Sequence, residues 1–219
     1  MTVWHITWFT LACAVGATAL MVPPCIALAW MLARRRFTGR SILETLVSLP
    51  LVMPPVATGL ILLALFSRRG PLGSILSAAG IDIVFTWKAV VIAMAIMGAP
   101  LLIRTARAGF EHVNRRYEDV AATLGASPAR IFFTISLPLA WPSVLAGAVL
   151  AFARALGEFG ATIVVAGSIP GATRTLAVAI YSYTETGQDS RAAALLVVSA
   201  VIAFAALWMA NHLSERRAA

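Results

Sequence analysis

Long apolar stretches alternate along the chain with short segments that hold most of the charged residues. The apolar stretches cover about residues 8–32, 43–66, 87–107, 139–157 and 191–212. A helix needs about 20 mainly apolar residues to cross the hydrocarbon core of a bilayer, and most of these stretches reach that length. The pattern predicts an all-α polytopic membrane protein with about five to six transmembrane helices and a single domain over residues 1–219.

The composition favours the same class. Of the 219 residues, 60% are hydrophobic and 12% are charged, whereas a soluble domain has about 25% charged residues. The net charge of +8 is compatible with nucleic-acid binding, but the basic residues lie in short loops between apolar stretches, as in membrane proteins. We therefore expect a lipid bilayer around the chain and no nucleic-acid partner.

The distribution of arginine predicts the orientation of the chain, because cytoplasmic loops are enriched in basic residues. Eleven arginines lie in segments that this rule places inside: Arg34, Arg35, Arg36, Arg40, Arg104, Arg107, Arg115, Arg116, Arg130, Arg216 and Arg217. The outer segments hold fewer basic residues, and the Arg68–Arg69 pair fits the assignment least well. The N-terminus is then outside and the C-terminus is cytoplasmic.

The second apolar stretch is rich in residues that interrupt helices, namely Pro50, Pro54, Pro55 and Gly59. They predict a bent or partly unwound helix, which is tolerated at membrane depth only where it is buried in protein or lines a cavity. Two interpretations remain open. The prolines either kink the helix for packing, or Pro54 and Pro55 belong to a translocation path.

The segment Tyr117–Pro138 combines charge, small residues and helix signals between strongly apolar neighbours. Four of its residues have helical spacing and would share one face with little side-chain bulk: Glu118, Ala121, Ala122 and Gly125. Gly125 offers a helix end, and Ser127–Pro128 offers the start of a second short helix, which Leu137–Pro138 would close. Spacing alone also fits a helix that packs only on the protein's own spans.

The same segment resembles the E-A-A-x-x-x-G loop of binding-protein-dependent ABC importer permeases. It reads E-D-V-A-A-T-L-G-A from Glu118 to Ala126, with Asp119 where that family has a small residue. In the family, this loop forms a coupling helix that docks on a cytoplasmic ATPase. The resemblance implies an ABC importer type I permease fold and a coupling loop over about residues 108–138. It implies ATPase coupling through Glu118, Asp119, Ala121, Ala122, Gly125 and Ala126.

Two charged residues, Arg154 and Glu158, stand four apart near the predicted outer end of a span. They form either an intrahelical pair that reaches the outer surface or a gate in an anion path. The surrounding A-F-A-R-A-L-G-E-F-G-A-T resembles a signature shared by molybdate and sulfate permeases. The later G-S-I-P-G-A-T-R-T-L resembles molybdate permeases more closely. A sulfate, thiosulfate or tungstate permease is the alternative within the class, and a stand-alone anion channel or secondary carrier is the alternative outside it.

The resemblance implies a larger assembly in a bacterial inner membrane. It comprises a homodimer of this subunit, a cytoplasmic ABC ATPase dimer and a periplasmic molybdate-binding protein. The only lysine is Lys88, so the chain cannot contain the G-x-x-x-x-G-K-[ST] phosphate loop. No His, Cys and carboxylate set has the spacing of a metal site. We expect no cofactor and no enzymatic activity in this chain, and ATP hydrolysis by the assembled complex.

Overall fold

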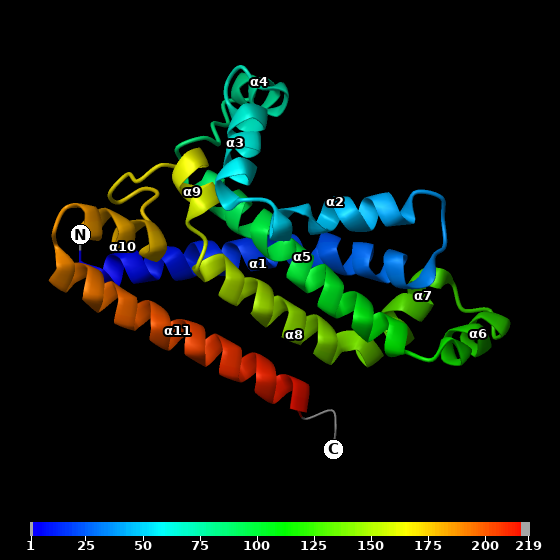
Figure 1. The fold of residues 1–219 in the computed structure, drawn as a ribbon. Coiled ribbons are helices and arrows are strands. Elements are labelled where there is room, and N and C mark those ends of the chain that lie inside the picture. The colour runs from blue at the N-terminus through cyan, green and yellow to red at the C-terminus, as the bar shows by residue number, and fades with distance from the viewer. Residues whose placement is uncertain (1, 216–219) are drawn as a thin grey trace.

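The computed structural model describes the backbone of residues 2–215 and the side chains of residues 2–209. Within that range all regular structure is helical, as expected (Figure 1). The elements in chain order are α1 (Val3–Arg34), α2 (Arg40–Val52), α3 (Pro55–Phe66), α4 (Pro71–Ala78), α5 (Trp87–His112), α6 (Arg115–Thr123), α7 (Pro128–Ile131), the π-helix η1 (Phe132–Ser136), α8 (Leu137–Leu156), α9 (Gly160–Val165), α10 (Leu176–Glu185) and α11 (Asp189–Glu215).

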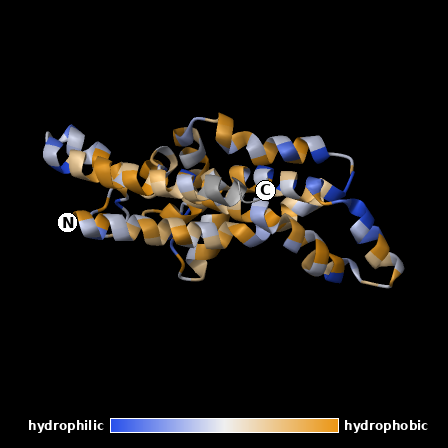
Figure 2. Ribbon diagram, turned by 90° about the horizontal axis from the view of Figure 1, so that it is seen from below, coloured by the Kyte–Doolittle hydropathy of each residue, from blue (hydrophilic) through white to orange (hydrophobic). Residues whose placement is uncertain are grey.

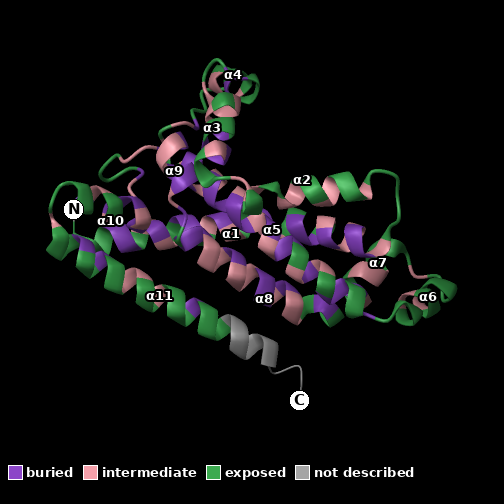
Figure 3. Cartoon of the chain, viewed as in Figure 1, coloured by how far each residue is buried: buried purple, intermediate pink, exposed green. Residues whose placement is uncertain are grey.

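The core is formed by α1, α5 and α8. Helix α5 packs along both of the others and is the most buried of the long helices (Figure 3). Small residues allow this close packing. A Cβ on Gly109 would lie 2.3 Å from the Cβ of Ser143 in α8, and a Cβ on Gly98 would lie 3.0 Å from the carbonyl oxygen of Ala151. Close backbone approach through small residues is typical of helices packed in membranes.

Helices α2 and α3 are separated by a short break at Met53 and Pro54 and bend by 113° relative to each other. The bend that the prolines predict is therefore present. Helix α3 packs tightly on α9, since a Cβ on Gly59 would lie 2.9 Å from the backbone of Ala161. Helix α2 has no buried residue and lies on the outside of the bundle (Figure 3).

Four helical stretches in the described part of the chain are long and apolar enough to cross a membrane: Val3–Arg34, Trp87–His112, Pro128–Leu156 and Asp189–Met209. The α2–α3 pair makes a fifth if it is one broken span. Figure 2 shows hydrophobic residues dominating the middle of the bundle, with hydrophilic residues gathered towards its ends. Arg216 and Arg217, which were counted for the orientation, lie outside the described residues.

One expectation from the sequence is wrong at Leu137–Pro138. The helix does not close there, because α7, η1 and α8 form one helical stretch from Pro128 to Leu156. The wide π turn explains why, since the N–H of Leu137 donates to the carbonyl of Phe132, five residues back. Proline has no N–H to donate, and its ring needs room in the preceding turn of the helix. The wider π turn directly before Leu137 provides that room for Pro138.

Candidate functional site

The helix α6 ends in a motif that requires glycine. The N–H of Gly125 donates to the carbonyl of Ala122 at 3.0 Å, and the N–H of Ala126 donates to that of Ala121, also at 3.0 Å. This pair of bonds is the Schellman motif, in which the residue after the helix adopts a left-handed conformation. Gly125 has φ +82°, a region where other L-residues are strained. The glycine thus ends α6 and reverses the chain.

The sequence predicts that Glu118, Ala121, Ala122 and Gly125 share one helical face, and this prediction is wrong for Gly125. Helix α6 ends at Thr123, so Gly125 lies beyond it. The left-handed conformation of the glycine ends the helix early. The structure exposes Asp119, Ala122 and Gly125, whereas Glu118, Ala121 and Ala126 are half-buried against the rest of the protein. The exposed surface of α6 also differs from the expected one, since it has large apolar side chains.

Glu118 joins α6 to two other elements. Its Oε1 accepts hydrogen bonds from Nε of Arg34 at 2.9 Å and from the hydroxyl of Ser136 at 2.7 Å. The side chains of Arg34 and Glu118 are only 9% and 16% exposed, so solvent screens this ion pair weakly. Arg34 also donates to the carbonyl of Val113 at 3.0 Å. This Glu118 cluster (Arg34, Glu118, Ser136) connects the end of α1, α6 and the π turn that leads into α8.

An apolar groove lies between α6 and the start of α8, and we name it the α6 groove. It has a volume of about 700 Å³ and is lined by Arg116, Tyr117, Val120, Ala121, Leu124, Thr134, Ile135, Pro138 and Leu139. Leu124 is 82% exposed, and Tyr117 and Val120 are 58% and 51% exposed. Neighbouring exposed apolar residues at the polar end of a membrane protein are typical of a protein-binding surface.

The Arg154–Glu158 pair lies at the other end of α8. Arg154 is in the last turn of α8, and Glu158 lies beyond the helix end at Leu156. Their atoms Nη1 and Oε2 are 2.8 Å apart, and Oε1 of Glu158 accepts from the N–H of Ala161 at 2.7 Å. Glu158 is 1% exposed, so the interpretation as an intrahelical pair that reaches the surface is wrong. The carboxylate instead holds the start of α9 against α8.

The structure places the proline candidates beside α9. A Cβ on Gly160, two residues after Glu158, would lie 2.7 Å from the Cβ of Pro55. Pro54 and Pro55 are themselves exposed at the break between α2 and α3. The path candidates Pro54, Pro55, Arg154 and Glu158 therefore lie in one region, whereas α6 lies at the opposite end of α8 (Figure 1).

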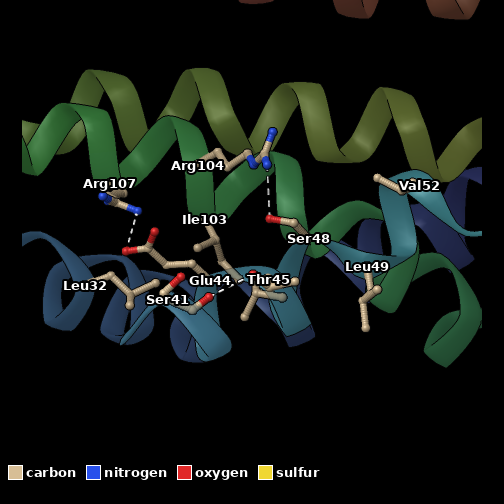
Figure 4. A pocket seen from close by; sticks show the side chains of 11 residues that line it. Leu32, Ser41, Glu44, Thr45, Ser48, Leu49, Val52, Ile103, Arg104 and Arg107 are labelled. Carbon is tan, nitrogen blue, oxygen red and sulfur yellow. Dashed lines mark hydrogen bonds and ion pairs between the residues drawn. The ribbon is translucent and has the colours of Figure 1, made fainter. Parts of the chain in front are cut away.

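A polar pocket between α2 and α5 was not predicted from the sequence. This α2–α5 pocket has a volume of about 470 Å³ and is lined by Leu32, Ser41, Glu44, Thr45, Val47, Ser48, Leu49, Val52, Ile103, Arg104 and Arg107 (Figure 4). A signal for it was present in the sequence, because Ser41, Thr45 and Ser48 recur at i, i+4 and i+7 and so form one polar face of a helix. No group of His, Cys, Asp and Glu in the described residues could hold a metal ion.

Comparison with known proteins identifies a family whose sequence pattern this chain matches. Residues 25–219 match the family described as binding-protein-dependent transport system inner membrane component. The chain is 42% identical over 219 residues to the molybdenum transport system permease protein ModB of Escherichia coli (strain K12), covering 97% of this chain and 96% of that one. It is 35% identical over 191 residues to the sulfate transport system permease protein CysT of Salmonella typhimurium, covering 87% of this chain and 69% of that one.

The fold also matches solved structures. A chain in the crystal structure of a bacterial alginate ABC transporter, in complex with an alginate pentasaccharide-bound periplasmic protein, superposes with a TM-score of 0.72. That match covers 97% of the present chain and 78% of the other, at 21% identity. At this identity the match concerns the fold alone, and the fold is that of an ABC importer permease.

Proposed function

This chain belongs to the family of binding-protein-dependent transport system inner membrane components, and we propose that it is the permease subunit of an ATP-driven molybdate importer. The choice of molybdate rests on one observation. Identity is 42% over nearly the whole length of the molybdenum permease of Escherichia coli, against 35% over a shorter alignment for the sulfate permease. Sulfate, thiosulfate and tungstate remain the alternative cargoes for a path of this architecture.

The α6 groove is the proposed docking surface for a cytoplasmic ATPase. Leu124, Val120 and Tyr117 offer an exposed apolar surface, and the Glu118 cluster fixes α6 to the membrane helices behind it. A cytoplasmic location is supported by the many arginines at this end of the bundle, with the N-terminus on the outer side. The chain has no phosphate-binding loop of its own, so the energy of ATP must come from another subunit.

We propose that two copies form the translocation path, with α2 and α3 at their interface. Helix α2 has no buried residue, and Val52 beside the helix break is 84% exposed. An interrupted backbone at membrane depth must be covered by protein or line an aqueous cavity. A two-fold homodimer satisfies both conditions at once, because it covers α2 and leaves the break beside a central path.

The continuous helix from Pro128 to Leu156 suggests how the two ends communicate. When ATP closes the ATPase pair, the docked α6 segments would move together. The Glu118 cluster would pass this movement to η1 and therefore to α8. The far end of α8 holds Arg154, whose ion pair with Glu158 positions α9 beside Pro55. Movement of α8 would then open or close the path at this outer end, where a periplasmic binding protein delivers the anion.

The cargo is tested by uptake of labelled molybdate in a strain that lacks its own molybdate and sulfate permeases. The strain would express this chain with its ATPase and binding-protein partners. We expect uptake that unlabelled molybdate abolishes and that a hundredfold excess of sulfate leaves nearly unchanged. Equal competition by sulfate would assign the chain to the sulfate alternative.

A further inference from the structure

We propose that the α2–α5 pocket is an oxyanion site at the inner end of the translocation path. In this site Arg104 and Ser48 would bind the anion before it enters the cytoplasm. The inference rests on the proposed function, because only an anion importer needs such a site.

The charges around the pocket leave Arg104 available for a ligand. Glu44 is paired with Arg40 at 2.7 Å and with Arg107 at 2.9 Å, and Arg107 also pairs with Glu111 at 2.7 Å. Among the described residues, no ion pair includes Arg104, whose Nη2 donates to the hydroxyl of Ser48 at 3.2 Å (Figure 4). A guanidinium has five N–H donors in a planar fork suited to an oxyanion, and one such bond leaves most of them unused.

The two carboxylates do not cancel this positive charge. Beside the pocket, Arg40 and Arg107 pair with Glu44 and Glu111, so these two guanidinium groups balance the two carboxylates. Arg104 is in no such pair among the described residues and adds one further positive charge. The carboxylates lie within hydrogen-bonding distance of the other two arginines and are neutralised by them. An anion at Arg104 therefore meets a positive charge that Glu44 does not offset, because Glu44 is already paired with Arg40 and Arg107.

Hydroxyl groups complete the site. The hydroxyl of Ser48 accepts from Arg104, so its own proton remains available to donate to an anion. Thr45, one turn earlier in α2, directs its hydroxyl proton to the carbonyl of Ser41 at 2.8 Å and contributes no donor. One arginine and one serine are few donors for a tetrahedral oxyanion. Binding should therefore be weak, as a transport path requires if the cargo is to leave.

The position of the pocket fits the path proposed above. Leu49 and Val52 line it on the side of the helix break at Met53–Pro54, and no residue of α2 is fully buried. The volume of about 470 Å³ accommodates an anion together with water molecules. The pocket thus connects the exposed break of the second span with the arginine-rich end of the bundle.

The test uses the complete transporter, with both ATPase subunits, purified without nucleotide. Binding of radiolabelled molybdate would be measured by equilibrium dialysis for the wild type, Arg104→Gln, Ser48→Ala and the control Arg68→Gln. Arg68 pairs with Asp82 at 2.7 Å on an exposed loop, so its variant removes the same charge elsewhere. We expect Arg104→Gln to weaken binding about tenfold and Ser48→Ala to weaken it about threefold, whereas Arg68→Gln has no effect.

Two further measurements distinguish the possible failures. Arg104→Lys keeps the charge but not the planar fork, so it should bind molybdate more tightly than Arg104→Gln and less tightly than the wild type. Such partial rescue would show that loss of charge, and not misfolding, weakens binding in Arg104→Gln. Unchanged binding in Arg104→Gln, or no saturable binding by a wild type that transports molybdate, would overturn the oxyanion site and leave the importer assignment intact. A wild-type complex that neither binds nor transports molybdate would overturn the proposed function itself.

Discussion

At the scale of single residues, Glu118 is the best-connected member of the segment that resembles a coupling loop. Its carboxylate contacts α1 through Arg34 and η1 through Ser136, and the pair with Arg34 is mostly shielded from solvent. Hydrogen bonds to charged groups contribute about 1.5–3 kcal/mol, so loss of this carboxylate is expected to loosen α6 from the membrane helices. In the proposed importer, Glu118 would act by positioning α6 and not by contacting the ATPase itself.

Replacing Glu118 with glutamine tests this role. The variant keeps the side-chain shape but leaves the guanidinium of Arg34 without a charged partner. We predict normal membrane abundance, retained ATPase activity and a several-fold loss of uptake per ATP hydrolysed. Asp189→Asn is the control, because Asp189 is an exposed carboxylate in the first turn of α11 and lies outside the α6 region. If both variants transport like the wild type, Glu118 has no role in coupling.

Gly125 provides a second prediction at this scale. An alanine at φ +82° is strained by roughly 1–2 kcal/mol, even though a Cβ there would meet no atom within 4 Å. We expect Gly125→Ala to loosen the end of α6 and lower uptake without lowering membrane abundance. Gly39→Ala introduces the same kind of strain at φ +91° in another loop, so it controls for strain alone. Equal uptake by the two variants would contradict a special role for the α6 end.

At the scale of elements, the junction of α8 and α9 depends on the Arg154–Glu158 pair. Removing one partner of a buried pair leaves an uncompensated charge and typically costs about 3–5 kcal/mol. We predict that Arg154→Ala lowers membrane abundance, and that adding Glu158→Gln restores it, because the amide oxygen still accepts from the N–H of Ala161. Uptake should stay low in the restored double variant. Full uptake would mean that the pair is structural only.

The same elements show what the sequence could and could not predict. The apolar stretches predict the long helices well, because helix length and hydropathy are local properties. The glycine and Ser127–Pro128 signals predict the end of α6 and the start of α7 for the same reason. The contact of Glu118 with Arg34 spans 84 residues and the α2–α5 pocket joins two distant helices. Such long-range contacts depend on tertiary packing, which no local pattern contains.

At the scale of the whole molecule, the uncovered face of α2 predicts a dimer. We expect Val52→Cys to form a disulfide with the same residue of a second copy when membranes are oxidised. The native Cys13 and Cys25 are buried, so they should not form intermolecular disulfides of their own in this assay. Phe204→Cys on α11 is the control, since that position is 74% exposed on a helix that packs against α8 and α10. A monomer in both variants would contradict the proposed interface.

Molybdate uptake into liposomes that contain this chain, its ATPase and its binding protein would show whether the chain is an ATP-driven importer subunit. We predict uptake only when ATP is present on the ATPase side. We also predict that Leu124→Asp, which places a charge in the apolar α6 groove, abolishes uptake while the chain remains inserted. Uptake by the chain alone, without ATPase or ATP, would contradict the importer assignment and identify a channel or secondary carrier.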